Sequence, residues 1–285
     1  MVRLMVARIH GLGRWLSLLG LCLPLGAAPV VTQRDADSLY HWAYSAAFGT
    51  GYYRIGDEEV YVLKVEPVVP LGWLKNRGVS TRLRLPFTFG YQSFGLEDIP
   101  DPIADLRTVT FVPGLDFDIP VKGSWVLKPY AHYGYGTQMS GGESAQIYYF
   151  GINSHVALPS LGNFEIKMIN GLQWFGQVPN HGSSDSFARL VTGFEGSFQL
   201  GSLKIRGRQL YFMPHIAHYW YFNSLGFRLL LEPPVEIKQE FEIALAVGIE
   251  ERISLYLFSF DRLGVAFKGG DDVQAIRIFI SSIFQ

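Results

Sequence analysis

The sequence predicts an all-β protein that folds as a closed antiparallel transmembrane β-barrel of about twelve strands. Three observations indicate this fold. The chain opens with an export signal, its interior alternates apolar and polar residues with a period of two, and it ends in a strand with an apolar outer face. That last strand, from Ala275 to Phe284, places Ile276, Ile278, Ile280 and Phe284 on one face. Such an ending is typical of the assembly signal of bacterial outer-membrane barrels.

Residues 1–28 have the three parts of a secretory signal peptide. A basic lead ends at Arg14, an apolar run follows from Trp15 to Leu25, and the small residues Gly26 to Ala28 come next. The alternative is an uncleaved helical anchor. Pro24 and the small residues interrupt the apolar run and favour cleavage, so we expect residues 29–285 to form the barrel.

The composition excludes several classes of protein. Aromatic residues make up 15% of the chain and 31 residues are glycine, whereas the mean hydropathy of +0.16 is too low for a bundle of membrane helices. The 24 Lys and Arg include three in residues 1–28, which hold no acid. The remaining 21 therefore face 25 acidic residues, and a net charge near −4 argues against nucleic-acid binding. The single cysteine, Cys22, lies in the signal, so the mature chain would form no disulfide.

Alternation recurs along the mature chain, and the stretch from Val79 to Tyr91 shows it clearly. Its odd positions are almost all apolar, whereas its even positions include Arg82 and Arg84. An apolar face opposite charged side chains is typical of a membrane barrel. A short helix over residues 36–47 is an alternative to the start of the first strand. The expected strands are 40–54, 59–71, 79–92, 107–119, 124–137, 145–158, 163–176, 187–200, 204–222, 235–249, 252–267 and 273–284.

Connection lengths indicate the orientation. Short turns such as Gly201-Ser202 and Glu250-Glu251 fall on one side, and longer loops such as 93–106 and 268–272 fall on the other. The short side holds both termini, which predicts that both are periplasmic. The longer loops collect acidic residues, and these either bind divalent cations at the lipopolysaccharide surface or are simply solvated.

The early strands point charged side chains toward the lumen. We expect cross-strand pairs between Glu66 and Arg84, between Arg82 and Asp116, and between Asp116 and Lys128. One interpretation is a surface that selects ions, and the other is a salt-bridge plug that fills a narrow lumen. Alternating signs favour the plug, because they largely cancel. The expected network consists of Lys64, Glu66, Arg82, Arg84, Asp116, Asp118 and Lys128.

A second set of charges lies on residues 235–249. Its acids include Glu240 and Glu242, and only one lysine, Lys238, shares their face. We expect inward bases on neighbouring strands, such as Arg206 or Arg252, to pair with this excess.

The sequence offers no catalytic or metal site. The run from His181 to Asp185 combines a histidine, serines and an acid, but such a short stretch within one loop is typical of a polar turn. His215 and His218 lie three apart in a strand, so they face opposite sides and cannot share a metal. We therefore expect neither an enzyme nor a cofactor, and the glycines of Gly49-Thr-Gly51 and Gly134-Tyr-Gly136 make room for neighbouring side chains.

Several segments resemble the solitary autotransporter-type outer-membrane barrels. These segments are 51–57 with 60–65, then 110–117, then 262–272 before the final strand. The resemblance covers the whole mature chain, and it implies a barrel similar to autotransporter translocators but without a passenger. The motifs are structural, so the resemblance implies no catalytic residues. Gln285 departs from the usual aromatic terminus.

Three functions remain open at this point. The first is a small channel or transport-related pore with a charged lumen. The second is a non-conducting structural or surface-interaction barrel of a Gram-negative cell envelope, and the third is a lipid-modifying barrel enzyme, which lacks a visible catalytic set. The expected partners are outer-membrane lipid, lipopolysaccharide and the barrel-assembly machinery, with no nucleic acid. The sequence does not identify a solute.

Overall fold

The computed structural model describes residues 49–55, 58–93, 106–139, 143–181, 184–205, 207–227, 235–255, 258–271 and 273–280. All of them belong to the second of two units into which the chain divides, residues 36–285. The predicted signal peptide, the start of the expected first strand and Phe284 lie outside the described residues. Among the described residues, no helix is both long and apolar enough to cross a membrane.

Within this described part, fifteen strand segments form one antiparallel sheet. One short 3-10 helix, Lys75–Arg77, lies in a turn. The strands are β1 Gly51–Ile55, β2 Glu58–Val65, β3 Val68–Leu71, β4 Ser80–Arg84, β5 Phe87–Ser93, β6 Leu106–Phe111, β7 Gly114–Lys122, β8 Trp125–Gln138, β9 Ser144–Ala157, β10 Phe164–Pro179, β11 Asp185–Ile205, β12 Arg208–Phe227, β13 Val235–Leu255, β14 Phe258–Gly270 and β15 Val273–Ile280.

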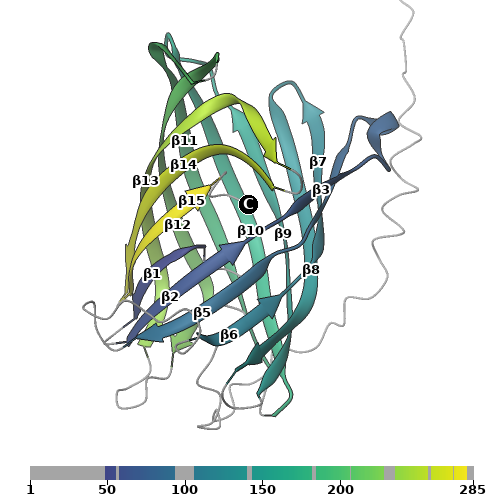
Figure 1. Cartoon of the computed structure of the whole chain (residues 1–285), viewed down its shortest axis with the longest axis vertical. Coiled ribbons are helices and arrows are strands. Elements are labelled where there is room, and N and C mark those ends of the chain that lie inside the picture. The colour runs from purple at the N-terminus through teal and green to yellow at the C-terminus, as the bar shows by residue number, and fades with distance from the viewer. Residues whose placement is uncertain are drawn as a thin grey trace, which may run out of the picture. The chain divides into compact units, whose positions relative to one another are not determined.

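The sheet closes on itself, as Figure 1 shows. From β8 the pairing runs through β6, β5, β2 and β1 to β15, and then in descending order to β9. β9 pairs with β8 along thirteen register positions from Trp125 to Thr137, which closes the ring. Three strands are each interrupted once, giving the segments β2 and β3, β4 and β5, and β6 and β7. Counting each pair as one strand gives the expected barrel of twelve.

The three interruptions coincide with Pro67, Pro86 and Pro113. Proline has no amide hydrogen, so it cannot donate to the ladder of a central strand. The prolines lie beside one another on consecutive strands, and each carbonyl still accepts a hydrogen bond from the next strand. The amide nitrogens are those of Leu85 to Pro67 at 2.9 Å, Val112 to Pro86 at 3.2 Å and Tyr133 to Pro113 at 3.0 Å. The strand breaks therefore form one line across the wall rather than three separate defects.

Gly134, on the unbroken strand β8, makes room for the neighbouring break between β6 and β7. A Cβ atom at Gly134 would lie well inside van der Waals contact of the Phe111 carbonyl oxygen and the Val112 Cα atom. We therefore expect Gly134→Ala to lower the free energy of unfolding by about 1–3 kcal/mol through overpacking. Gly72→Ala is the matched control, because a Cβ there meets nothing within 4 Å. Denaturant unfolding in detergent measures both, and equal midpoints would contradict this account.

The twelve expected strands are confirmed, but two expected turns are wrong. Gly201-Ser202 lies within β11, and Glu250-Glu251 lies within β13. Both fall where the register shifts, between Gln199 and Lys204 on β11 and between Gly248 and Ile253 on β13. A β-bulge accommodates the extra residues, and Gly201 takes a φ of 53° that favours glycine. Lys268, expected in a loop, is likewise part of β14.

The outer surface of the barrel is apolar. Ile276, Ile278 and Ile280 of the expected assembly signal are 52%, 51% and 63% exposed. Their neighbours Ala275 and Val273 are almost fully buried on the inner face. The same alternation holds over residues 239–248 of β13, where every second side chain points outward. Near the start of β13 the phase shifts, so Ile237 is buried and Lys238 is exposed, the reverse of the expected faces. This arrangement brings the charged side chains of several strands together inside.

Candidate functional site in the barrel lumen

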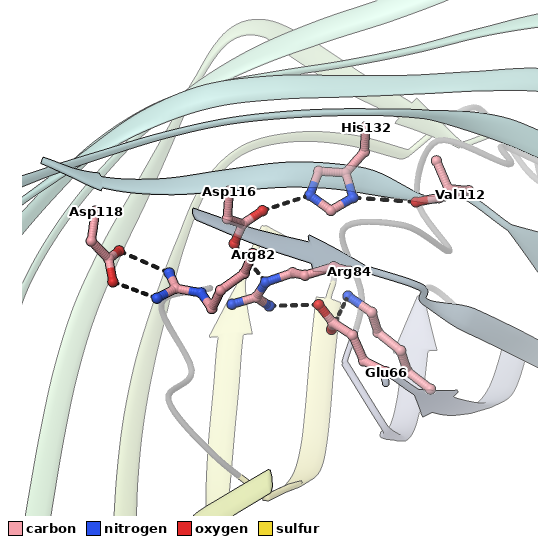
Figure 2. A network of polar contacts seen from close by, with 8 residues as sticks. Glu66, Arg82, Arg84, Val112, Asp116, Asp118 and His132 are labelled. Atoms are coloured by element: carbon pink, nitrogen blue, oxygen red, sulfur yellow. Dashed lines mark hydrogen bonds and ion pairs between the residues drawn. The ribbon is translucent and has the colours of Figure 1, made fainter. Parts of the chain in front are cut away.

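The first lumenal network is a chain of ion pairs across the broken strands, shown in Figure 2. Glu66, between β2 and β3, lies 3.2 Å from Lys64 and 2.5 Å from the Arg84 Nη1 atom. The Nε atom of Arg84 lies 2.5 Å from Asp116 on β7. Asp116 in turn contacts His132 Nε2 on β8 at 2.9 Å. Arg84 thus bridges two carboxylates, and the chain of contacts spans the four strand segments β2, β4, β7 and β8.

A second pair lies beside this chain. The two terminal guanidinium nitrogens of Arg82 donate to the two carboxylate oxygens of Asp118, which is the bidentate arrangement typical of strong arginine pairs. Arg82 stands directly opposite Asp116 in the register, and that pair was expected. The side chain instead reaches diagonally to Asp118, two residues along. Arg84 likewise pairs with Asp116, which lies two residues along from Gly114, the residue directly opposite Arg84.

The expected pair between Glu66 and Arg84 is therefore present, whereas Arg82 contacts Asp118 rather than the expected Asp116. Asp116 itself contacts Arg84 and His132. Lys128 stands opposite Asn153 on β9. The expected network does not include His132, although His132 lies four residues after Lys128 on the same strand and therefore faces the same side.

The second network centres on Glu242 of β13, whose side chain is fully buried. Arg277 of β15 contacts its Oε2 atom at 2.5 Å. On its other side, the Tyr219 hydroxyl donates to Oε1 at 3.2 Å, and His215 Nε2 lies 3.3 Å from the same oxygen. Gly51 makes room for Arg277, because a Cβ atom there would meet the Arg277 side chain and backbone. This confirms the interpretation of that glycine.

Glu240 has its own partners two residues away. Lys268 of β14 lies 2.5 Å from its Oε2 atom, and the Tyr221 hydroxyl donates to the same oxygen at 2.6 Å. Lys268 also lies 4.2 Å from the centre of the Tyr219 ring, a cation–π contact. Glu240 and Glu242 of β13 are thus paired by Lys268 and Arg277, whereas the expected Arg206 and the side chain of Arg252 lie outside the described part. Arg277 lies between the outward-facing Ile276 and Ile278, so the alternation of the strand already indicated in the sequence that the Arg277 side chain points inward.

A third ion pair crosses the inner face of the sheet. Arg262 of β14 contacts Glu195 of β11 at 2.5 Å, although β12 and β13 lie between these strands. Neighbouring strands are about 4.8 Å apart, so the pair spans about 14 Å of wall. The inward residues of β13 at this level are Ala246 and Gly248, which leave space for the two long side chains. The pair is therefore a bridge across part of the lumen.

Stacked rings join the first two networks. His132 stacks on Tyr149 with 4.4 Å between ring centroids, and Phe175 follows at 5.7 Å. Phe187 and Tyr221 continue the series at 4.9 and 5.8 Å. The series runs from β8 to β12 on the inner face and ends at the Tyr221 hydroxyl that donates to Glu240.

Arg189 of β11 lies within this aromatic layer. Its guanidinium carbon is 5.0 Å from the centroids of both Phe175 and Tyr219, and its Nε atom donates to Gln173 at 2.7 Å. Inward side chains that meet in this way leave little room for water. Consistent with this, Ile147 and Val191 on the same face are 0% and 2% exposed.

The two histidines on β12 face opposite sides, as expected. His215 is buried beside Glu242, whereas His218 stacks on Phe241 of the outer face at 4.4 Å between ring centroids. Of the expected polar turn from His181 to Asp185, Asp185 begins β11, and residues 182–183 lie outside the described part.

The fold and its interior define a closed twelve-stranded antiparallel β-barrel with an apolar outer face and an ion-paired, aromatic inner face. No protein-family model matches the sequence. No curated protein is similar to it in sequence. Among solved structures, the chain is similar to the β domain of the Bordetella autotransporter BrkA. The TM-score is 0.51 with 9% identity, and the match covers 80% of this chain and 93% of that chain. At this identity the likeness shows an autotransporter-type barrel fold.

Proposed function

We propose that the protein is an integral outer-membrane β-barrel whose lumen is closed by its own side chains. In this proposal it serves the cell envelope as a structural or surface-interaction barrel. The observation that carries the proposal is the set of lumenal contacts. The pair between Glu195 and Arg262 bridges non-adjacent strands, and Glu242 within the second network is 0% exposed. Side chains lining a water-filled pore would instead be solvated.

The apolar outer face, the barrel fold and the predicted export signal support this location. Lipid accepts a backbone only when its polar groups are paired internally, and a closed barrel satisfies this condition. Shorter connections at the end that holds the predicted termini support a periplasmic position for both. The outer loops would then meet lipopolysaccharide or envelope partners, and the assembly machinery would recognise the final strand.

A small channel with a charged lumen is the second candidate. The charged residues favour it, but in the described part they occur as paired opposite charges, which leave no net field to select an ion. A solute pathway would require these pairs to separate. The proposal therefore places the closed barrel ahead of the channel.

Conductance in planar lipid bilayers tests the proposal. We expect the wild-type protein to give no steady current steps at high protein loading. We expect the double variant Glu195→Ala with Arg262→Ala to give measurable steps, because it removes both ends of the bridge and leaves neither Glu195 nor Arg262 without its partner.

Val265→Ala is the control, because Val265 lies on the outer face of β14 and is 54% exposed. This variant should be as silent as the wild type. Regular ohmic steps from the wild-type protein would reject the closed barrel and favour the channel.

A further inference from the structure

Four polar residues form a row across the outer wall of the barrel. Ser154 of β9 stands directly opposite Asn170 of β10, and Asn170 stands opposite Thr192 of β11. Thr192 in turn stands opposite His218 of β12. Thr192 is exposed and the other three are half-buried. We call these four residues the polar row.

The polar row faces outward rather than into the lumen. The residue before each member is buried on the inner face, and Val191 and Ala217, for example, are each 2% exposed. The outward positions two residues before and after each member are apolar. These neighbours are Ile152, Val156, Met168, Leu172, Leu190, Phe194, Ile216 and Trp220. The polar row therefore crosses the middle of an otherwise apolar surface.

Hydrogen bonds within the wall satisfy only part of the polar row. The Thr192 hydroxyl donates to Asn170 Oδ1 at 3.1 Å, and the Trp125 indole nitrogen donates to the Ser154 hydroxyl at 2.9 Å. Within the described residues, the side-chain nitrogen of Asn170 has no acceptor. Lipid tails offer none, so the amide would be left unpaired at a cost in free energy.

We infer that the polar row is the centre of a contact between two copies of this chain within the membrane. Serine, threonine and asparagine side chains each donate and accept hydrogen bonds, so the surface is complementary to itself. A two-fold axis along the membrane normal, between β10 and β11, would place Asn170 of each copy opposite Thr192 of the other. The Asn170 amide would then donate to a hydroxyl, and the flanking apolar residues would pack around the pair.

This inference rests on the proposed outer-membrane location, and a cross-linking experiment tests the two separately. Cys22 is the only cysteine in the chain, so Thr192→Cys in a Cys22→Ser background carries one thiol. Val265→Cys in the same background is the matched control on β14. After mild oxidation of isolated outer membranes, we expect a disulfide-linked species of twice the monomer mass from Thr192→Cys and almost none from Val265→Cys.

A second measurement asks whether the polar groups themselves drive association. In lipid bilayers, Asn170→Leu with Thr192→Val should lower the association constant of the copies about tenfold, the effect of one or two hydrogen bonds in lipid. This variant adds only apolar groups to the outer face, so the barrel should still fold and keep its heat-modifiable migration on gels.

Three results would overturn the contact between copies. They are equal cross-linking at the two cysteine positions, a wild-type protein that stays monomeric in bilayers, and a cross-link only to a protein of different mass. Each of these leaves the outer-membrane location intact. Absence of the wild-type chain from the outer-membrane fraction would instead reject the proposed function itself.

Discussion

Replacing Glu242 by leucine should lower the free energy of unfolding by about 3–5 kcal/mol, because it leaves the buried cation of Arg277 without its carboxylate. The Tyr219 hydroxyl would also lose its acceptor. Because β13 and β15 would no longer be tied together across β14, we expect the variant to melt early on heated gels. Denaturant titration in detergent micelles, with the intrinsic fluorescence of the barrel, measures the change.

The double variant Glu242→Leu with Arg277→Leu separates the charge effect from packing. Replacing a whole buried pair with apolar residues is often neutral, so this variant should recover much of the lost stability. Ile243→Ala, on the outer face next to Glu242, should change stability far less. If the single and double variants lose the same free energy, unpaired charge is not the cause.

Removing Arg82 and Arg84 together should both destabilise the barrel and loosen its lumen. Arg84 alone neutralises Glu66 and Asp116, and Arg82 holds Asp118. We expect Arg82→Ala with Arg84→Ala to lower the free energy of unfolding by about 3 kcal/mol, the lower end for a broken buried pair, because Lys64 and His132 still contact two of the carboxylates. The same variant should show current steps in planar bilayers where the wild type is silent.

Two controls accompany this variant. Arg84→Lys keeps the charge but loses the double contact, so it should fall between the wild type and the alanine variant. Leu83→Ala, on the opposite face of β4, should leave the conductance unchanged. A folded Arg82→Ala, Arg84→Ala protein with no current would show that these arginines do not close the lumen, and the bridge between Glu195 and Arg262 would then be the remaining candidate.

The strand pattern made the fold predictable. Along β4 and β5, Arg82, Arg84 and Thr88 share the inner face while Phe87 points outward, and this is visible in the sequence because the side chains of a strand alternate strictly. The same rule placed Ile276 and Ile278 outside. It fails at bulges, which look like turns in the sequence. Gly201 is followed by Ser202 and the pair Glu250-Glu251 is followed by Arg252, so both segments look polar, yet their strands continue past them.

The lumenal site was predictable in composition but not in pairing. Alternation correctly turned Glu66, Arg84 and Asp116 inward. It could not show that Arg84 and Arg82 each reach two residues along the neighbouring strand, because this depends on the lean of side chains in a tilted sheet. The partners of Glu240 and Glu242 were missed for two reasons. Lys268 lies beyond the expected end of its strand, and Arg277 lies on β15, which is not a neighbour of β13.

The sequence by itself determined that this protein is a barrel with an apolar exterior, because a period of two assigns each side chain to a face without any knowledge of its neighbours. Only the tertiary structure decided what the interior does. Ring closure brings β11 toward β14 and β13 toward β15, and Arg262 and Arg277 then reach acids on strands that are not their neighbours. Contacts of this kind depend on curvature and register, which are properties of the closed sheet rather than of any one strand.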